Sequence, residues 1–330
     1  MSKVAPGIYQ LQIPIPSIAT RHVNIYVVEG GAGYLLIDTG WDNDETFDAV
    51  KKQAADIGVS LEEISQIVIT HIHPDHYGLA GRLRGLSNAQ IYIHKQERDI
   101  IESRYISMDG LLQQVAQWLL LNGVPLDELG ELQKASVPVR RFVAPVWPDI
   151  TLYGGETITA GDFNFEVLWT PGHAPGHICL YEPTSKLLFS GDHILPTITP
   201  NVGLHPQSSA NPLGDYIDSL NRIKQLEVNL VLPGHEAPFT DLEKRVAEII
   251  KHHEGRNAEI LKAIEAEPKT AYQIATELTW SASWQSLDKW NKRLAVLETV
   301  AHLESMRLVG EIDKFSRDSK VYYHSHDVAK

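Results

Sequence analysis

In the first part of the chain, up to about Phe239, short β-type runs alternate with helical segments. Runs of apolar or alternating residues end repeatedly at Gly, Pro or Asp, which is the pattern of strands in an α/β domain. The predicted strands are GIYQLQIPI, HVNIYVVEG, GYLLID, QIVIT, AQIYIH, DITLYG, FNFEVLW, HICLYE, KLLFSGD and NLVLPG. Helices are predicted near 44–57, 78–86 and 213–226, and the segment HICLYEPTSKLLFSGD predicts a hairpin that turns at Pro183, Thr184 and Ser185.

Two regions depart from this alternation. Residues 97–145 have a mostly helical pattern, broken at Gly123 and Pro125, and predict either an insertion that covers a site or ordinary layer helices of the domain. From about Leu242 the strand runs stop. Three helical segments, AEILKAIEAEP, TAYQIATEL and WNKRLAVLETVAHLESMRLVG, precede a hairpin with its turn near Arg317 and Asp318, which is the order of a winged helix. We therefore expect a catalytic domain over 1–245 and a helical, winged-helix domain over 246–330.

Composition narrows the setting of the protein. The 330 residues carry a net charge of -13, which argues against nucleic acid or an anionic membrane as a partner. No apolar stretch is long enough to span a bilayer, and the N-terminus lacks the apolar core of a secretory signal. The single cysteine, Cys179, excludes an internal disulfide and suits a reducing cytosol, so we expect a cytoplasmic protein. Cys179 itself is expected in the core.

The segment THIHPDHYG, residues 70–78, carries the strongest chemical signal. His71 and His73 are two apart and project to the same side of an extended strand end. Pro74 suits the first position of a following helix, whose opening turn would hold Asp75 and His76. One strand-to-helix corner can thus direct four ligands at one place. Imidazole and carboxylate together suit zinc, iron or manganese.

Three later segments offer further ligands in the same way. TPGHAPGH follows the strand FEVLW and contains His173 and His177, LLFSGD ends a strand at Asp192, and LVLPGHE ends a strand at His235. In each segment, an apolar strand ends in small residues before a side chain that can bind a metal. Functional side chains are commonly found where the strands of a sheet end. Their order after the histidine cluster predicts one composite site.

This series of motifs resembles the metallo-β-lactamase fold hydrolases, in particular the glyoxalase II-like branch, over roughly residues 7–240. The resemblance implies an αββα sandwich with two divalent transition metal ions at one edge of the sheets, most commonly zinc, with iron or manganese as the alternatives. Carried over by position, the first metal would be held by His71, His73 and His173. The second would be held by Asp75, His76 and His235, with Asp192 bridging both.

Other residues are candidates near the metals or the substrate. Asp38 in LLIDTG matches a family aspartate close to the ligands, and His177 is a candidate for a residue that supports the ligands without being one. Tyr77 either reaches an oxyanion or packs at the helix start, and packing is the more common role of such an aromatic residue. His205, in the loop after Asp192, lies where the family often lines its substrate pocket.

The resemblance implies a metal-dependent hydrolase of ester-type bonds. A hydroxide that bridges the metals would attack the carbonyl of a small ester, thioester or lactone, and Asp75 would orient it as the catalytic carboxylate. The alternative is a metal-dependent ribonuclease or phosphodiesterase that uses the same site, with the winged helix as an RNA grip. A metal-responsive DNA-binding regulator is a third hypothesis, but a sensor needs no bridging aspartate.

Charge separates these hypotheses. Residues 256–330 hold eleven Lys/Arg and eleven Asp/Glu, and the third helix mixes signs and is largely apolar, which favours a packing or dimerisation module over nucleic-acid binding. A phosphodiesterase needs a basic rim, for which Arg82, Arg84, Arg140 and Arg141 are the nearby candidates. We therefore expect a small-molecule acyl substrate, with lactonase or thioesterase activity, and a homodimer through the apolar tail.

Overall fold

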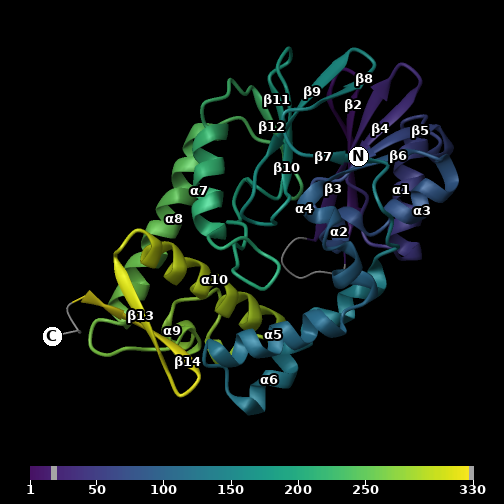
Figure 1. Cartoon of the computed structure of the whole chain (residues 1–330). Helices are drawn as coiled ribbons and strands as arrows, with labels where there is room; N and C mark the ends of the chain where they lie inside the picture. The colour runs from purple at the N-terminus through teal and green to yellow at the C-terminus, as the bar shows by residue number, and fades with distance from the viewer. Residues whose placement is uncertain (16–20, 327–330) are drawn as a thin grey trace.

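The computed structural model describes residues 1–15 and 21–326 of the chain. Within these residues a seven-stranded sheet packs face to face against a five-stranded sheet (Figure 1). The first sheet has the order β1-β2-β3-β4-β5-β6-β7, antiparallel from β1 to β4 and parallel from β4 to β7. Its strands are β1 (Ser2–Ala5), β2 (Ile8–Pro14), β3 (His22–Gly30), β4 (Gly33–Ile37), β5 (Ile64–Val68), β6 (Gln90–His94) and β7 (Ile150–Leu152).

The second sheet has the order β12-β11-β10-β9-β8, antiparallel except for the parallel pair of β11 and β12. Its strands are β8 (Thr157–Ala160), β9 (Phe163–Trp169), β10 (Ile178–Glu182), β11 (Leu187–Gly191) and β12 (Leu230–Pro233). Glu182 pairs with Leu187 across the turn between β10 and β11, so the predicted hairpin is confirmed. The short strands β1 and β8 were not among the predicted runs.

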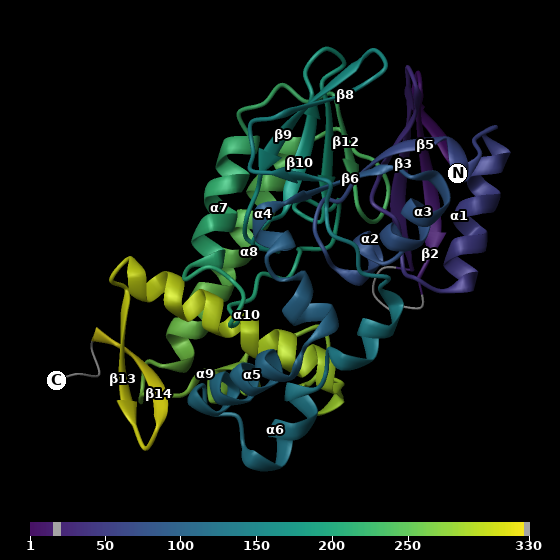
Figure 2. The ribbon, with the colours of Figure 1, turned by 45° about the vertical axis from the view of Figure 1, so that its right-hand side comes forward.

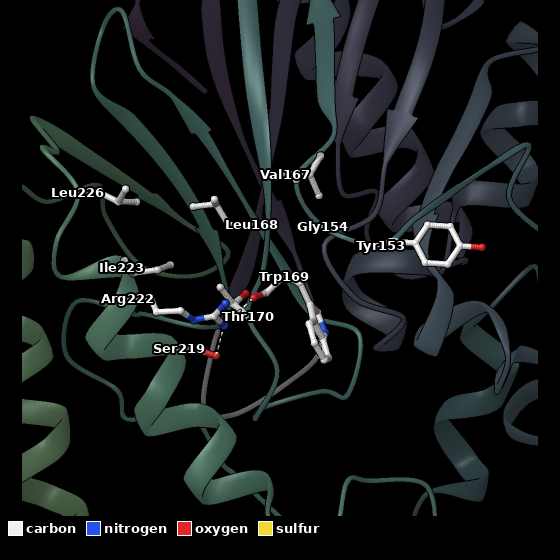
Figure 3. Close-up of a pocket in the computed structure, with 11 residues that line it drawn as sticks. Tyr153, Gly154, Val167, Leu168, Trp169, Thr170, Ser219, Arg222, Ile223 and Leu226 are labelled. Carbon is white, nitrogen blue, oxygen red and sulfur yellow. Dashed lines mark hydrogen bonds between the residues drawn. The ribbon is translucent and has the colours of Figure 1, made fainter.

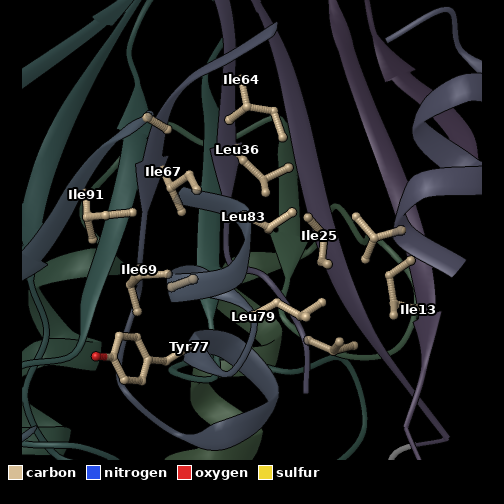
Figure 4. Close-up of a cluster of buried hydrophobic side chains, with 14 of the residues drawn as sticks. Ile13, Ile25, Leu36, Ile64, Ile67, Ile69, Tyr77, Leu79, Leu83 and Ile91 are labelled. Atoms are coloured by element: carbon tan, nitrogen blue, oxygen red, sulfur yellow. The ribbon is translucent and has the colours of Figure 1, made fainter. Parts of the chain in front are cut away.

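Helices cover the outer face of each sheet. Helices α1 (Asp44–Asp56) and α3 (Ala80–Ser87) bury apolar residues against the first sheet, in the cluster of Figure 4. Helices α7 (Pro212–Ile223) and α8 (Leu242–Ala263) do the same on the second sheet. Between the sheets, Tyr26, Phe165 and Phe189 stack edge to face in a third apolar layer. The predicted αββα sandwich is confirmed.

Residues 97–145 are helical, as the pattern predicts. They contain the end of α4 (Lys95–Arg98), the π-helix Glu102–Ile106, α5 (Asp109–Leu121), α6 (Leu126–Gln133) and the 3-10 helix Val137–Phe142. Helices α5 and α6 leave the sandwich and lie beside α10 (Lys289–Leu308) in both Figure 1 and Figure 2. Buried side chains of α5, α6, α9 (Ala271–Glu277) and α10 form one apolar cluster there.

The C-terminal part consists of α8, α9 and α10, followed by the hairpin of β13 (Ile312–Arg317) and β14 (Lys320–Ser325). Helix α8 begins at Leu242, where the chain was expected to turn helical, and it includes the start of the segment AEILKAIEAEP. The domain boundary expected at 245 falls inside this helix. The hairpin turn is at Asp318 and Ser319, both with positive φ, one residue later than predicted. Over residues 1–15 and 21–326, no helix combines the length and apolarity that crossing a membrane requires.

Candidate metal centre

The segment THIHPDHYG forms the corner that its sequence predicts. Strand β5 ends at Val68, His73 is still extended, and Pro74 occupies the first turn of the short helix α2 (Pro74–Tyr77). Pro74 fits there because the first turn of a helix leaves its N–H groups without intrahelical acceptors. Asp75 and His76 follow within that turn. The corner is held from outside by Tyr105, whose hydroxyl donates to the carbonyl of Ile72.

The other ligand candidates also follow strand ends at the same edge of the sandwich. His173 comes after β9, Asp192 directly follows β11, and His235 comes after β12. Close approach here requires glycine. A Cβ at Gly234 would lie 2.5 Å from Asp192 Oδ1, and one at Gly191 would lie 2.7 Å from His177 Nε2.

The seven predicted ligands come together as three overlapping groups. In each group the ligand atoms all lie within 4.8 Å of one another. The groups are His71, His73 and His173; Asp75, His76 and His235; and His71, His76 and Asp192. The first two are the ligand sets that the resemblance implies. The third contains members of both sets together with Asp192, which therefore lies between them.

Distances define how the groups meet. His73 Nδ1 is 2.9 Å from His71 Nε2 and 3.1 Å from His173 Nε2. Asp192 Oδ1 is 3.4 Å from His76 Nε2, whereas its Oδ2 is 3.4 Å from His235 Nε2 and 3.8 Å from His173 Nε2. The carboxylate of Asp192 thus faces both sets.

The outward ring nitrogens are held by the protein. His173 Nδ1 donates to the carbonyl of Asn201 at 2.8 Å, and His235 Nδ1 donates to the carbonyl of His22 at 2.7 Å. His76 Nδ1 lies 2.7 Å from Asp38 Oδ2. Because a carbonyl only accepts, His173 and His235 must carry their proton on Nδ1, which leaves the inward Nε2 as a lone-pair donor. This is the tautomer that metal ligation needs.

Electrostatics distinguish the two sets. Burial and the neighbouring imidazoles lower the pKa of His71 and His73 well below the ordinary value, so both are neutral near pH 7. Burial acts in the same direction on His235, but Asp192 and Asp75 outweigh it and raise its pKa to about 10. The pKa of His76 is likewise raised, against burial, by nearby carboxylates of which Asp192 is the strongest. A cation is therefore favoured beside these carboxylates.

The residues present fit a pair of divalent metal ions. His76 Nε2 and Asp192 Oδ1 are buried, and neither has a hydrogen-bond partner within the described part of the chain. Buried polar atoms without partners are costly, and these two belong to a His/Asp set suited to transition metals. A divalent ion held by each set would satisfy them.

Residues next to the ligands have different roles from one another. Asp38, at φ 63, accepts from the Thr70 backbone N–H at 2.8 Å as well as contacting His76. His177 Nε2 accepts from the backbone N–H of Asp192 at 3.1 Å, so it positions that ligand. Tyr77 does not face the ligands: its buried hydroxyl donates to the Val146 carbonyl at 2.6 Å, which corrects the oxyanion alternative in favour of packing.

Sequence reasoning missed a buried carboxylate that joins two ligand-bearing segments. Glu97 accepts from the backbone N–H groups of Ile72, at 3.0 Å, and Gly176, at 2.8 Å. Its position at the end of the strand AQIYIH was the available signal, since the other buried carboxylates of the site also follow strands. Glu97 therefore fixes the segment that carries His71 and His73 relative to the segment that carries His173.

The four arginines that could have formed the basic rim of a phosphodiesterase are engaged elsewhere, so they give that alternative no support. Arg82 pairs with Asp44, Arg84 pairs with Asp149, Arg140 donates to the carbonyls of residues 105 and 106, and Arg141 lies over a phenylalanine ring. Two other arginines are closer to this region: in addition to burial, Arg104 helps to lower the pKa of His73, and Arg104 and Arg293 both help to lower that of His205. They come from segments far apart in the sequence and have no local motif.

A surface groove of about 370 Å³ lies beside β9 and α7 (Figure 3). Trp169 and Arg222 line it, and Arg222 donates to Ser219 Oγ at 3.2 Å. None of the seven predicted ligands is among its lining residues. Thr170, which does line it, contacts His177 Nδ1 at 2.8 Å, so the groove lies behind the metal ligands rather than over them.

Comparison with known proteins agrees with the family that the sequence motifs resemble. A family model described as the metallo-beta-lactamase superfamily matches residues 18–235. A probable metallo-hydrolase of Bacillus subtilis, YqjP, is 28% identical over 95% of this chain and 96% of its own length. A beta-lactamase-like protein 2 homolog of Caenorhabditis elegans is 27% identical over 84% of this chain and 75% of its own.

Among solved structures, a metallo-beta-lactamase family protein from Thermus thermophilus superposes with a TM-score of 0.85 and 29% identity. The match covers 98% of this chain and all of that one. A beta-lactamase domain protein from Burkholderia ambifaria gives a TM-score of 0.78 at 26% identity, over 98% of this chain and 94% of that one. Both matches include the helical insertion and the C-terminal part.

Proposed function

The chain belongs to the metallo-beta-lactamase superfamily, and we propose that it is a binuclear metal-dependent hydrolase of small esters, thioesters or lactones. The observation that carries the proposal is the position of Asp192, whose carboxylate faces histidines of both ligand sets. A single-metal site has no need of a carboxylate shared in this way. The relative named as a probable metallo-hydrolase supports the general reaction class.

Each ligand set would hold one divalent metal ion, with zinc favoured by the His/Asp donors and iron or manganese as alternatives. Bound there, the ions would acidify a water molecule and polarise the scissile carbonyl. His71, His73 and His173 provide the neutral side of the site, and Asp75, His76 and His235 the charged side. We also propose that the chain belongs to the glyoxalase II-like branch of the superfamily.

Asp75 is proposed as the catalytic carboxylate. Its side chain is 20% exposed, compared with 11% for Asp192 and 3% for Asp38, so it is the acid of this group that substrate reaches most easily. Its Oδ2 lies 3.3 Å from His235 Nε2, which favours the ionised form. Asp75 would accept the proton of the attacking water at the carboxylate oxygen that is not used as a metal ligand, and return it to the leaving group.

The C-terminal part is proposed to be a winged helix that packs against the rest of the chain instead of binding nucleic acid. Its equal numbers of acidic and basic residues give it no overall attraction for polyphosphate. A homodimer and a cytoplasmic location complete the proposal.

Metal analysis and a substrate panel test the function together. The purified protein should hold about two transition metal ions per chain and hydrolyse members of a panel of aryl esters, lactones and thioesters. Asp192→Ala should abolish this activity, because it removes the group shared by both sets. Asp162→Ala, at an exposed position in the β8–β9 turn, is the matched control and should behave as wild type. Metal-dependent cleavage of RNA by a protein inert toward the panel would overturn the acyl proposal in favour of the ribonuclease.

A further inference from the structure

Two arginines lie on segments outside the sandwich that pack next to the metal centre. Arg104 belongs to the π-helix Glu102–Ile106 in the insertion, and Arg293 belongs to α10 in the C-terminal part. The loop that follows Asp192 and contains His205 lies between these two elements.

Hydrogen bonds tie these elements together around the ligands. On one side of Arg104, Ser103 Oγ accepts from Gln207 Nε2 at 2.9 Å, which joins the π-helix to the His205 loop. On its other side, Tyr105 donates to Ile72, between His71 and His73. The π-helix therefore bridges the loop and the metal-ligand corner, with Arg104 between the two attachments.

The same loop rests on α10. The backbone N–H of Leu204 donates to the Leu297 carbonyl at 3.1 Å, and Asn201 Nδ2 donates to Glu298 Oε2 at 3.0 Å. Asn201 also holds His173 through its carbonyl. Arg293 lies one helical turn before Leu297, on the segment that faces this loop.

Electrostatic effects agree with this placement. Burial, with the charges of Arg104 and Arg293, lowers the pKa of His205 to about 3. Burial and Arg104 lower the pKa of Arg293 to about 10, which still leaves it charged near pH 7. Arg104 also contributes to the lowered pKa of His73, after burial and His173. Two cations and a neutral imidazole thus share one region beside the first ligand set.

Neither arginine has an anionic partner among residues 1–15 and 21–326. Arg293 Nη1 donates to Ser136 Oγ at 3.0 Å and weakly to the Gln133 carbonyl, both neutral groups. Within the same described ranges, no hydrogen bond or ion pair is formed by the Arg104 guanidinium. The two other largely buried arginines, Arg245 and Arg256, each pair with a glutamate. Two half-buried like charges without a counter-ion lower the stability of the folded protein. The presence of this arginine pair therefore favours an anionic ligand.

We propose that Arg104 and Arg293 form an anion site that binds a carboxylate or phosphate group of a small acyl substrate while its ester bond lies at the metal centre. His205 lines this site as a neutral hydrogen-bonding group. The inference rests on the proposed hydrolase function and narrows its substrate class from small esters to negatively charged ones. The insertion and the C-terminal part would then line the substrate pocket and determine which acyl groups bind.

A matched pair of substrates tests the anion site by kinetics. Aryl butyrate and aryl hemisuccinate have the same ester bond and acyl length, and they differ only in a terminal methyl or carboxylate. The wild-type protein should prefer the hemisuccinate. Arg104→Ala and Arg293→Ala should each raise KM for the hemisuccinate about tenfold or more, with kcat and the butyrate reaction little changed. Arg293→Lys, which keeps the charge, should recover part of the loss, and Arg98→Ala, at an exposed position in α4, should have no effect.

A binding measurement on the full-length metal-loaded protein provides a readout that does not depend on turnover. Succinate, 3-phosphonopropionate and butyrate share one carboxylate, so differences in their effect on the thermal unfolding midpoint report the second anionic group. Succinate or the phosphonate should stabilise more than butyrate, and whichever is better identifies the group. The excess should disappear in the Arg104 and Arg293 alanine variants and persist in Arg98→Ala.

The outcomes separate the two proposals. An arginine-dependent advantage of the dianions without hydrolysis of either ester would support the anion site and refute the esterase. Equal stabilisation by all three acids, or an excess that both alanine variants retain, would overturn the anion site. So would arginine-dependent binding of a short oligoribonucleotide that the dianions do not displace, because the pair would then be part of a nucleic-acid surface.

Discussion

Replacing Asp38 by asparagine changes the proton position on a metal-ligand candidate without changing the shape of the site. Asp38 Oδ1 accepts from the Thr70 backbone N–H at 2.8 Å, and Oδ2 lies 2.7 Å from His76 Nδ1. A backbone N–H only donates, so the introduced asparagine must keep its oxygen toward Thr70 and turn its NH₂ group toward His76. Asparagine also tolerates the left-handed backbone at this position, φ 63.

The expected loss follows from that geometry. An NH₂ donor beside Nδ1 makes this nitrogen the acceptor and moves the ring proton to Nε2, the atom that faces Asp192 and Asp75. A protonated Nε2 cannot bind a metal, so each binding event must first reverse the tautomer. Loss of such a partner weakens metal affinity about 10–100-fold, or about 1.4–2.8 kcal/mol, and the effect should fall on the set containing His76.

Competition titration with a chromophoric chelator measures the two metal affinities separately. In Asp38→Asn one ion should be bound as in the wild type, by the three-histidine set, and the other about 10–100-fold more weakly. Asp42→Asn is the matched control, because Asp42 lies close to Arg82, away from the ligands. Unchanged affinity for both ions in Asp38→Asn would show that Asp38 does not set the His76 tautomer.

Three further predictions concern stability and reactivity. In denaturant titrations, Tyr77→Phe should lower the free energy of unfolding by about 1–3 kcal/mol, with activity retained. The control Tyr153→Phe, at an exposed side chain, should leave it unchanged. A Tyr77→Phe protein that loses activity at full stability would contradict the packing role. Burial raises the pKa of the Cys179 thiol to about 12, so the thiol is protonated at pH 8 in the folded protein. Mass spectrometry should therefore detect iodoacetamide labelling of Cys179 only after unfolding in urea. Rapid labelling of the native protein would refute this. Metal removal by a chelator should lower the thermal unfolding midpoint in proportion to the logarithm of free metal, since ligands of the folded state stabilise it by mass action; a midpoint independent of metal would contradict a folded-state site.

The parts of the site that follow strands could be predicted from sequence. Apolar runs that end in glycine or threonine before His71, Asp192 and His235 specify both the strand and the place where a side chain leaves it. Because these strand ends meet at one edge of the sandwich, the ligand candidates come together without any knowledge of loop conformation. The short edge strands β1 and β8 escaped detection because SKVA and TITA mix polar and small residues over only four positions, whereas β12, of the same length, is a continuous apolar run.

The outer partners of the ligands could not be predicted. The carbonyls of His22 and Asn201 hold two ring nitrogens, and a carbonyl is present at every position, so its use depends on the fold alone. Arg104 and Arg293 were missed for a related reason. They are separated by most of the chain, and only the packing of α5 and α6 against α10 places their segments near the same ligands.

The shared core of the insertion and the C-terminal helices limits how this protein can be divided. Val115 and Leu119 of α5 pack with Ala295 and Val296 of α10, and the backbone N–H of Tyr272 donates to the Asn122 carbonyl at 3.0 Å. Two stretches that are separated in the chain by strands β7 to β12 therefore form one structural unit. A truncation, circular permutation or domain graft that takes one stretch without the other would expose an apolar face on each half. Recombination between relatives should exchange both stretches together, as a single module.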